Sequence, residues 1–344
     1  MKSVYINNHG PRNVLTYGEL PENTPKSTEV KVKIHSCSLN RLDIFTRMGI
    51  KGINLNLTKP HILGGDFAGE IIEVGQKVTD KKIGDRVVIN PGLICLKCEN
   101  CIQGFTELCS NSGRIGLTTN GGYAEFGIVP SINTYHIPKS IPFSEASTLP
   151  TVFLTAWTML TRKSQLKDTE TVLIVSGSSG VGAAAIQIAK NVIGAKVITT
   201  TSTKEKALKA KALGADYVIL NKENLNQKIN EITNNQGVNV IIDHLGQKTW
   251  ENAFKFLAKG GRFCICGVTS GHKGEIHLGQ IFANNQSVMG TFMGRHKDLE
   301  KIIQLSANKQ IGNIIDSEFP LHRIKDAHKL MENRNFFGKI VISI

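Results

Sequence analysis

The chain has 344 residues, of which 40% are hydrophobic and 20% charged. These values are typical of a globular protein large enough for two domains. No stretch approaches the roughly 18 uninterrupted apolar residues of a membrane span, and the first residues lead into a strand-like segment rather than a signal peptide. We therefore expect a cytoplasmic protein with no membrane partner.

The net charge of +13 favours negatively charged partners in general. However, the basic residues are scattered along the chain, with no arginine block and no interleaved aromatic residues. This pattern is typical of a solvated surface, so we do not expect a nucleic-acid partner.

The first part of the chain, residues 1–141, has the texture of a small β-rich domain. Short segments of alternating apolar residues are bounded by Gly, Pro and Asn, which is the pattern of strands. These segments lie at residues 30–34, 69–75 and 85–89.

Residues 142–308 alternate short apolar runs with helix-length segments. The apolar runs lie at residues 171–175, 196–200, 217–220, 238–243, 262–266 and 287–290. The amphipathic candidates include residues 183–192, 204–213, 250–257 and, after the last run, 297–308. This alternation predicts an α/β fold, a doubly wound parallel sheet of the Rossmann type. A final apolar run at 338–342 predicts that residues 309–344 return to complete the first domain.

A glycine-rich turn follows the first of these apolar runs and precedes a helical pattern. In this context backbone N–H groups and the positive end of a helix can hold a pyrophosphate. The motif departs from G-x-G-x-x-G because a serine takes the middle glycine position. The predicted cofactor-binding residues of the turn are Gly177, Ser178, Ser179, Gly180, Val181 and Gly182.

The end of the second predicted strand indicates which cofactor binds. An NAD-specific fold presents Asp or Glu there, whereas this chain has Thr201 and Ser202, with Lys206 nearby. Hydroxyl groups and a cation suit a 2′-phosphate, so we predict NADPH; the alternative is that Lys206 lies on a solvated helix face. At two later strand ends, His244 and Gly267 are expected to flank the cofactor.

Four of the seven cysteines are clustered in a polar loop near residues 92–112. They are Cys95, Cys98, Cys101 and Cys109. Four thiolates at such short spacings can complete a closed tetrahedral shell, which predicts one structural zinc per chain. The alternatives are an iron–sulfur cluster, disulfides and a metal-free, cysteine-rich loop.

Motifs spread over nearly the whole chain resemble those of medium-chain dehydrogenase/reductases, with an N-terminal domain similar to the GroES fold. The motifs are residues 10–15 (GPRNVL), 39–43 (LNRLD), 60–69 (PHILGGDFAG), 83–87 (IGDRV), the four-cysteine lobe, 121–125 (GGYAE), 154–157 (LTAW) and the glycine turn. The chain resembles both the quinone oxidoreductase and the zinc-binding alcohol dehydrogenase branches. The resemblance also implies a homodimer or a homotetramer that pairs through residues 287–292.

The resemblance implies that the ligands of a catalytic zinc are missing. Where zinc alcohol dehydrogenases carry cysteine, histidine and cysteine, this chain has Asn40, Gly65 and Thr151. These residues cannot form the open three-ligand site that catalytic zinc needs. A different site made of His35, His61 and Asp43 is the alternative.

Without a catalytic metal, oxidising a simple alcohol is difficult, because the metal is the Lewis acid that assists it. Reducing a quinone or the activated C=C of an enone or enal is easier, because charge moves onto an oxygen that hydrogen bonds can stabilise. We therefore predict NADPH-dependent reduction of such a small-molecule substrate, with Asn40, Asp43 and Arg47 as candidate catalytic residues. Phe45 stands where some quinone reductases carry a tyrosine, which leaves solvent as the proton source.

Two alternatives remain open at the level of sequence. One is an alcohol dehydrogenase that acts on alcohols or aldehydes; the other is a non-catalytic NADPH-binding or RNA-binding protein. The segments 47–59 and 290–295 are expected to shape the substrate site, and their residues do not name a substrate.

Overall fold

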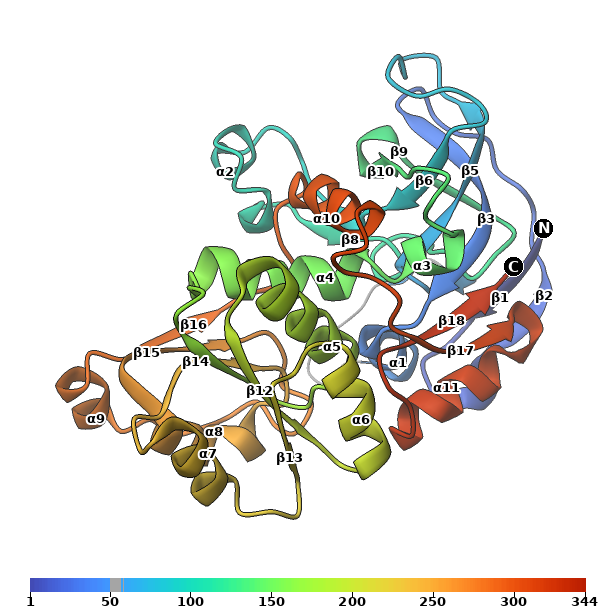
Figure 1. Cartoon of the computed structure of the whole chain (residues 1–344). Coiled ribbons are helices and arrows are strands. Elements are labelled where there is room, and N and C mark those ends of the chain that lie inside the picture. The colour runs from blue at the N-terminus through green and yellow to red at the C-terminus, as the bar shows by residue number, and fades with distance from the viewer. Residues whose placement is uncertain (50–56, 58) are drawn as a thin grey trace. The chain divides into compact units, whose positions relative to one another are not determined.

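The computed structural model describes residues 1–49, 57 and 59–344, so most of the predicted substrate-shaping segment 47–59 lies outside the described residues. The chain divides into two compact units (Figure 1). Unit 1 comprises Met1–Thr151 and Arg295–Ile344, and unit 2 comprises Val152–Gly294. These boundaries differ from the expected ones, which followed residues 141 and 308.

Two helices explain the difference in boundaries, because both pack within unit 1. Helix α3 (Phe143–Ser147) lies against strand β3 (Glu29–Ser38): the rings of Phe143 and His35 stack at 4.5 Å, and Ser38 Oγ donates a 2.7 Å hydrogen bond to the carbonyl of Ser147. Helix α10 (Asp298–Ala307) is tied to α3 by a 3.1 Å hydrogen bond from Ser306 Oγ to Glu145 Oε1.

The described residues of unit 1 form three β-sheets. A three-stranded sheet has the order β2-β1-β4, from Thr16–Glu19, Lys2–Ile6 and His61–Ile62. A seven-stranded sheet has the order β10-β6-β5-β3-β18-β17, with β9 also paired to β3. Its other strands are Thr134–His136, Arg86–Ile89, Asp66–Val74, Lys339–Ser343, Ile315–Pro320 and Phe126–Pro130. A two-stranded ribbon pairs β7 (Gly92–Leu93) with β8 (Gly113–Arg114).

The last strand, β18, returns to the first part of the chain as predicted. It pairs antiparallel with β3, with Val341 opposite Ser38. Apolar side chains of β3, β5 and β18 alternate into the core of unit 1, where Val32, Phe67 and Ile340 are fully buried. The remaining helices of unit 1 are η1 (Arg12–Val14), α1 (Arg41–Met48), α2 (Glu99–Ile102), η2 (Thr106–Leu108), η3 (Ser131–Asn133), η6 (Leu321–Arg323) and α11 (Ile324–Asn333).

Unit 2 contains the predicted parallel sheet, in the order β13-β12-β11-β14-β15-β16. Its strands are Tyr217–Leu220, Lys196–Thr201, Thr171–Ile174, Val238–Asp243, Leu257–Ile265 and Ser287–Gly290. The central strands β11 and β14 are mostly apolar and largely buried, as expected of strands covered on both faces. The order reverses between β11 and β14, which is where α/β sheets of this kind bind ligands.

Crossovers between parallel strands are right-handed as a rule, so connections that run in opposite directions from β11 place their helices on opposite faces of the sheet. The helices of unit 2 are η4 (Thr158–Lys163), α5 (Gly180–Gln187), η5 (Ile188–Ile193), α6 (Lys204–Ala212), α7 (Leu225–Thr233), α8 (Gln247–Phe256) and α9 (Leu278–Ala283), while α4 (Pro150–Trp157) contains the boundary between the units. The doubly wound fold is therefore as predicted from the alternation of apolar runs and helical segments. None of the described helices is long and apolar enough to cross a bilayer.

Candidate functional site

The glycine turn of unit 2 joins β11 to α5, at the carboxyl end of the central strand. Ser179 is the N-cap of α5, and its Oγ accepts a 2.9 Å hydrogen bond from the N–H of Gly182. The two glycines are needed for close packing: a Cβ on Gly177 would lie 2.3 Å from Thr199 Oγ1, and one on Gly182 would lie 2.4 Å from the carbonyl oxygen of Ser176. The turn therefore brings the positive end of α5 to the edge of the sheet, where a pyrophosphate would bind.

His244 follows β14 and reaches the same turn. Its Nε2 lies 2.8 Å from Ser179 Oγ. Burial lowers the pKa of His244, so the ring is neutral at pH 7. Because Ser179 Oγ already accepts from Gly182, its own proton is free to bond to His244. Gly267 also lies beside His244, and a Cβ there would be 2.7 Å from the His244 carbonyl oxygen. The predicted cofactor-binding residues 177–182, 244 and 267 thus share one edge of unit 2.

The end of β12 carries the predicted 2′-phosphate residues. Thr201 is buried and Ser202 is exposed. Thr203 caps α6, because its Oγ1 accepts a 3.2 Å hydrogen bond from the backbone N–H of Lys206. The side chain of Lys206 is half-buried. A phosphate here would meet hydroxyl groups, a helix N-terminus and lysine, while the acidic residue of the first turn, Glu205, lies 3.4 Å from Lys209 Nζ.

The four clustered cysteines of unit 1 lie together as their spacing predicts. Their sulfur atoms all lie within 4.8 Å of one another, compared with roughly 3.8 Å in an ideal zinc–tetrathiolate shell. Backbone N–H groups of Ser110 and Cys101 lower the pKa of Cys98 to about 6, whereas burial and neighbouring thiols raise the pKa of Cys101 to about 12. A divalent cation is the group that would hold all four as thiolates, so the donor set fits zinc.

A second polar cluster lies in unit 1, around the positions where zinc alcohol dehydrogenases hold their catalytic metal. Asn40 Nδ2 donates a 2.8 Å hydrogen bond to Asp66 Oδ2. Lys339 Nζ donates a 2.8 Å hydrogen bond to Asn40 Oδ1 and lies 3.7 Å from Asp66 Oδ2. All three residues are buried. Burial lowers the pKa of Lys339, while the carboxylates of Asp66 and Asp43 oppose that shift.

Thr151 joins Arg114 to the same cluster. Its Oγ1 donates a 2.6 Å hydrogen bond to Asp66 Oδ1 and accepts a 2.6 Å hydrogen bond from Arg114 Nη2. Arg114 is 5% exposed, and it lies at the end of the short strand β8. The two side chains that stand at cysteine positions of zinc enzymes, Asn40 and Thr151, are thus both hydrogen-bonded to one carboxylate.

Gly65 stands at the position where zinc enzymes carry histidine, and it has no room for a side chain. A Cβ there would lie 2.9 Å from the carbonyl oxygen of Ile115, 3.2 Å from Pro91 Cβ and 3.9 Å from Arg114 Nε. The contact with the Ile115 carbonyl oxygen is too close for a real Cβ atom without a shift of the backbone, and the contact with Pro91 is tighter than most. Even an alanine would therefore be strained.

Asp43 lies in the first turn of α1, whose N-cap is Asn40. Its Oδ2 accepts a 2.7 Å hydrogen bond from the backbone N–H of Asn40. Burial raises the pKa of Asp43 to about 6. The alternative ligand set of His35, His61 and Asp43 is not brought together in the described structure: His35 stacks on Phe143, and His61 Nε2 lies 3.3 Å from the Gly116 carbonyl oxygen.

The expectation for Arg47 is corrected by its contacts. Arg47 is 1% exposed, and all three of its guanidinium nitrogens have partners. Nε donates to the carbonyl of Gly10, Nη1 lies 3.1 Å from His328 Nδ1, and Nη2 pairs with Glu332 Oε1 at 2.6 Å. Arg47 therefore holds α1 against α11 and is not available to a substrate.

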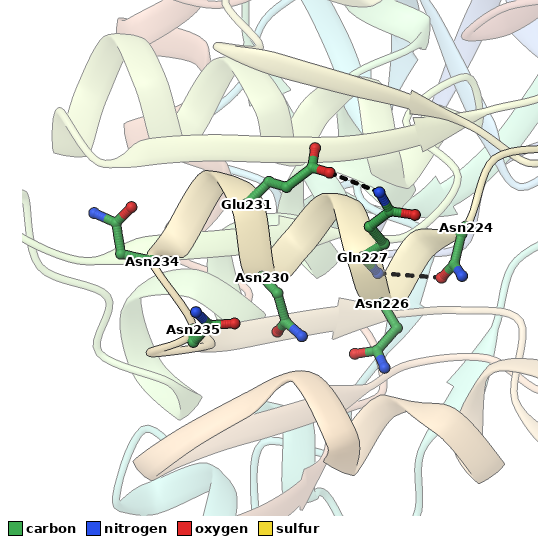
Figure 2. A pocket seen from close by; sticks show the side chains of 7 residues that line it. All are labelled: Asn224, Asn226, Gln227, Asn230, Glu231, Asn234 and Asn235. Carbon is green, nitrogen blue, oxygen red and sulfur yellow. Dashed lines mark hydrogen bonds between the residues drawn. The ribbon is translucent and has the colours of Figure 1, made fainter.

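A surface hollow over α7 in unit 2 does not have the composition of an active site (Figure 2). It is lined by Asn224, Asn226, Gln227, Asn230, Glu231, Asn234 and Asn235. Asn224 caps the helix, and Asn234 and Asn235 take left-handed conformations after its end, which asparagine tolerates well. These roles account for several of the amides, and the hollow contains no base paired with a nucleophile.

Sequence reasoning missed Arg114, Asp66 and Lys339 as members of the polar cluster. Asp66 could have been found from the sequence, because it lies next to Gly65 in the motif of residues 60–69 that carries the family resemblance. Arg114 and Lys339 belong to no local motif; only the fold brings them to Asp66.

The chain matches two family models, the "Alcohol dehydrogenase GroES-like domain" over residues 26–139 and the "Zinc-binding dehydrogenase" over residues 180–308. Among its relatives, it is 30% identical to the "Quinone oxidoreductase-like protein 2 homolog" of Nematostella vectensis, covering 92% of this chain and 82% of that protein. It is 28% identical to the "Acryloyl-coenzyme A reductase" of Sulfurisphaera tokodaii, covering 99% of both.

Solved structures agree with these matches. An NAD-dependent alcohol dehydrogenase has the same fold with a TM-score of 0.96 and 35% identity, covering 100% of both chains. With two matched domain models in the expected order and the same fold over the whole length, this chain is a member of the medium-chain dehydrogenase/reductase superfamily and a nicotinamide-dependent oxidoreductase.

Proposed function

We propose that this protein uses NADPH to reduce a quinone or the activated C=C of an enone or enal, without a catalytic zinc. The proposal rests on the three positions at which zinc alcohol dehydrogenases carry the ligands of the catalytic zinc. Asn40 and Thr151 are hydrogen-bonded to Asp66, and Gly65 has no space for a ligand side chain. A reaction that needs no Lewis-acid metal suits this arrangement best.

The nicotinamide cofactor supplies the hydride when it is bound. The chain's own part is binding and electrostatics. The turn from Gly177 to Gly182 holds the pyrophosphate at the N-terminus of α5, and His244 keeps Ser179 in place. Phe45 has no proton to donate, so the proton that completes the reduction comes from solvent.

Two relatives support the choice of substrate class. The names of the quinone oxidoreductase-like protein and of the acryloyl-coenzyme A reductase both indicate acceptors in which a carbonyl is conjugated to a double bond. We extend that class to this chain because such acceptors need only hydrogen bonds at the carbonyl oxygen.

We propose NADPH rather than NADH on the basis of Thr201, Ser202 and Lys206. The test is to compare KM for the two cofactors in the wild type and in Lys206→Gln. We expect KM for NADPH to rise by about tenfold in the variant, the usual effect of losing a charge-assisted hydrogen bond, and KM for NADH to stay the same. A wild-type preference for NADH would contradict the assignment.

We also propose one structural zinc in the four-cysteine cluster and a dimer that forms along β16. The second proposal draws on exposed apolar residues at that edge, Val288 at 39% and Phe292 at 69%. An unpaired edge strand with apolar side chains is a suitable surface for pairing with a second copy.

The second candidate is an alcohol dehydrogenase, which the 35% identity to a solved NAD-dependent alcohol dehydrogenase favours. Measuring which substrates the protein turns over distinguishes the reductase from the alcohol dehydrogenase. Quinones, enals and enones are assayed with NADPH, and primary and secondary alcohols are assayed with NADP. We expect reduction of the conjugated acceptors; fast oxidation of an alcohol that is lost on metal removal would establish the alternative. Cofactor binding without turnover of either the conjugated acceptors or the alcohols would indicate a non-catalytic protein.

A further inference from the structure

Ser179 and His244 form a hydrogen-bonded pair within unit 2, where the glycine turn leads into α5. Ser179 Oγ lies 2.8 Å from His244 Nε2, and both residues are half-buried, so the fold does not enclose them. Serine stands here at the middle glycine position of the dinucleotide-binding motif. A glycine could make no such bond, so the motif itself does not require the pair.

The first turn of α5 has donors for a phosphate next to this pair. Ser179 Oγ takes the N–H of Gly182 at 2.9 Å. Among the described residues, no hydrogen bond takes the N–H of Gly180 or of Val181, as is usual for the first N–H groups of a helix. A phosphate bound to these two N–H groups would lie beside the hydroxyl of Ser179, the residue that precedes them.

The hydroxyl of Ser179 has a single hydrogen, which it gives either to His244 or to another acceptor. A serine hydroxyl donates one hydrogen bond and accepts up to two. With the ring neutral, Ser179 accepts from Gly182 and donates to His244 Nε2. With the ring protonated, Nε2 becomes a donor, so Ser179 accepts from both partners and its hydrogen is released. The protonation state of His244 therefore decides whether the hydroxyl is available to a phosphate.

The surroundings of His244 can hold the ring in either state. Burial lowers its pKa, whereas Asp243 and hydrogen bonds to backbone carbonyls, including that of Ser176, act in the opposite direction. The carboxylate of Asp243 is fully buried and is fixed by the N–H of Leu245 at 2.7 Å and by Thr249 Oγ1 at 2.6 Å. A protonated ring thus has both acceptors and a fixed negative charge beside it.

The other elements around the pair add few titratable groups. Residues 175–187, which form the turn and α5, contain no titratable side chain. The loop after β15 contributes Cys266, whose thiol stays neutral because burial raises its pKa. Helix α8 contributes Lys248, which is exposed. His244 is therefore the group at this edge that is suited to take up a proton when a phosphate binds.

We propose that His244 is a proton-linked positioning residue of the cofactor site: when the pyrophosphate binds, His244 takes up a proton and the Ser179 hydroxyl turns from the ring to a phosphate oxygen. The inference rests on the proposed function, because it takes the glycine turn as the pyrophosphate site. The proton comes from solvent and forms the Nε2–H bond; no other covalent bond is made or broken. The complex gains a hydroxyl donor and a positive charge beside the phosphates.

Proton uptake makes the cofactor affinity depend on pH. Because the pyrophosphate favours the charged ring, the pKa of His244 is higher in the complex than in the free protein. The affinity therefore rises as pH falls through the pKa of the complex, and it levels off below the pKa of the free protein. A turn that bound the pyrophosphate through backbone N–H groups alone would show no such dependence.

Calorimetric titration of the wild type and of His244→Gln with NADPH, between about pH 5 and pH 8, tests the proposal. For the wild type we expect Kd to fall about tenfold toward the acidic end, the usual effect of one charge-assisted hydrogen bond. Titrations in two buffers of different ionisation enthalpy should also show proton uptake on binding. His244→Gln should lose both effects. The 2′-phosphate of NADPH also titrates in this range, so the quantity compared is the difference between the two proteins.

Ser179→Gly tests the role of the hydroxyl. Glycine is the usual residue at this position of the motif, and as an N-cap it costs only a few tenths of a kcal/mol relative to serine. We expect Ser179→Gly to bind NADPH at pH 8 about as well as the wild type and to lose most of the strengthening at acidic pH. If it keeps the full strengthening, the ring acts without the hydroxyl and the proposal is overturned.

His277→Asn is the matched control. His277 is an exposed histidine of unit 2 that caps α9 by accepting a 3.0 Å hydrogen bond from the N–H of Gln280, and asparagine can take over the cap. Its pH profile should match that of the wild type. If His244 serves only to support the turn, His244→Gln will raise Kd by the same factor at every pH, which would also overturn the proposal. Ser179→Gly provides an independent test should His244→Gln fail to fold.

Failure of the proposed reaction is kept separate, because the measurement needs no acceptor. The same titrations with NADH, which has the same pyrophosphate, keep it independent of the cofactor preference. If the wild type reduces no quinone, enal or enone but its affinity shows the pH dependence that His244→Gln lacks, the reaction is wrong and the role of His244 stands. If the acceptors are reduced and the affinity is the same at every pH in both proteins, the reaction stands and the role of His244 is refuted.

Discussion

Lys339 Nζ donates a 2.8 Å hydrogen bond to Asn40 Oδ1, although the two residues lie 299 positions apart in the chain. Lys339 also bonds to the Leu39 carbonyl and is 2% exposed. Its ammonium group lies 3.7 Å from the carboxylate of Asp66, which is fully buried, and balances that negative charge. The contact therefore links the two ends of unit 1 through a buried charge pair.

Replacing Lys339 with methionine should destabilise the protein strongly. The change leaves Asp66 buried without its cation, which typically costs about 3–5 kcal/mol of unfolding free energy. Urea denaturation at pH 7 measures the loss. Adding Asp66→Asn to the Lys339→Met variant should recover part of it, because the unpaired charge is then removed. Lys325→Met, at an exposed position of α11, is the control and should have little effect. Equal stability of the two lysine variants would contradict the account.

Asp43 should make stability depend on pH. Burial raises its pKa from 3.8 to about 6 in the folded state. Between about pH 4 and 6 the folded chain therefore binds more protons than the unfolded chain, and stability falls as pH rises through that window. The total contribution is about 3 kcal/mol.

Asp43→Asn should remove this dependence while its amide oxygen still accepts from the Asn40 N–H. Denaturation curves at several pH values between 4.5 and 7.5 should show a flatter profile for the variant and a greater stability than the wild type at pH 7. Asp326→Asn, at an exposed position, should leave the profile unchanged. Parallel profiles for Asp43→Asn and the wild type would show that Asp43 titrates normally.

Gly182→Ala should damage cofactor binding. The added methyl group would lie 2.4 Å from the Ser176 carbonyl oxygen and 2.8 Å from Gly177 Cα, and both are backbone atoms that cannot move freely. The strain should cost about 1–3 kcal/mol and displace the N-terminus of α5. We expect at least a tenfold increase in the Kd for NADPH, measured by fluorescence titration. Gly290→Ala is the control, because a Cβ at Gly290 meets nothing within 4 Å. Unchanged affinity in Gly182→Ala would count against the turn as the pyrophosphate site.

Metal analysis should find about one zinc per chain, and Cys98→Ser should lose it. Because the lobe then lacks the cation that ties its cysteines together, the variant should also unfold at a lower temperature. Cys266→Ser provides the comparison, since Cys266 is half-buried just beyond β15 and outside the cluster. If Cys98→Ser retains zinc, or if carefully prepared wild-type protein contains none, the assignment of a structural zinc site to the four cysteines is wrong.

Much of unit 2 could be predicted from the sequence, because its strands, helices and glycine turn are each specified by residues that are close together in the chain. Each apolar run of four to six residues formed a strand of the parallel sheet, and the serine–glycine turn formed a helix N-terminus. The cysteine cluster was predictable for the same reason, since all four sulfurs come from 15 consecutive residues.

The polar cluster was not predictable in this way. Its cations, Arg114 and Lys339, come from a two-residue strand and from the last strand, and their neighbours in sequence give no sign of a shared site. Arg47 was misjudged for the same reason: its partners His328 and Glu332 lie more than 280 positions away. Long-range pairing of charges depends on the completed fold, which local patterns do not encode.

The return of β18 to β3 has a consequence for synthesis on the ribosome. Unit 2 is one continuous stretch of chain and can fold as soon as it has emerged, whereas β3 and Asp66 are made early and must wait for Lys339. During that interval the β-rich part of the nascent chain has an open edge and an unbalanced carboxylate. A chain that terminates prematurely before residue 339 keeps both defects, so it should be recognised by chaperones and proteases even though its cofactor-binding unit is intact.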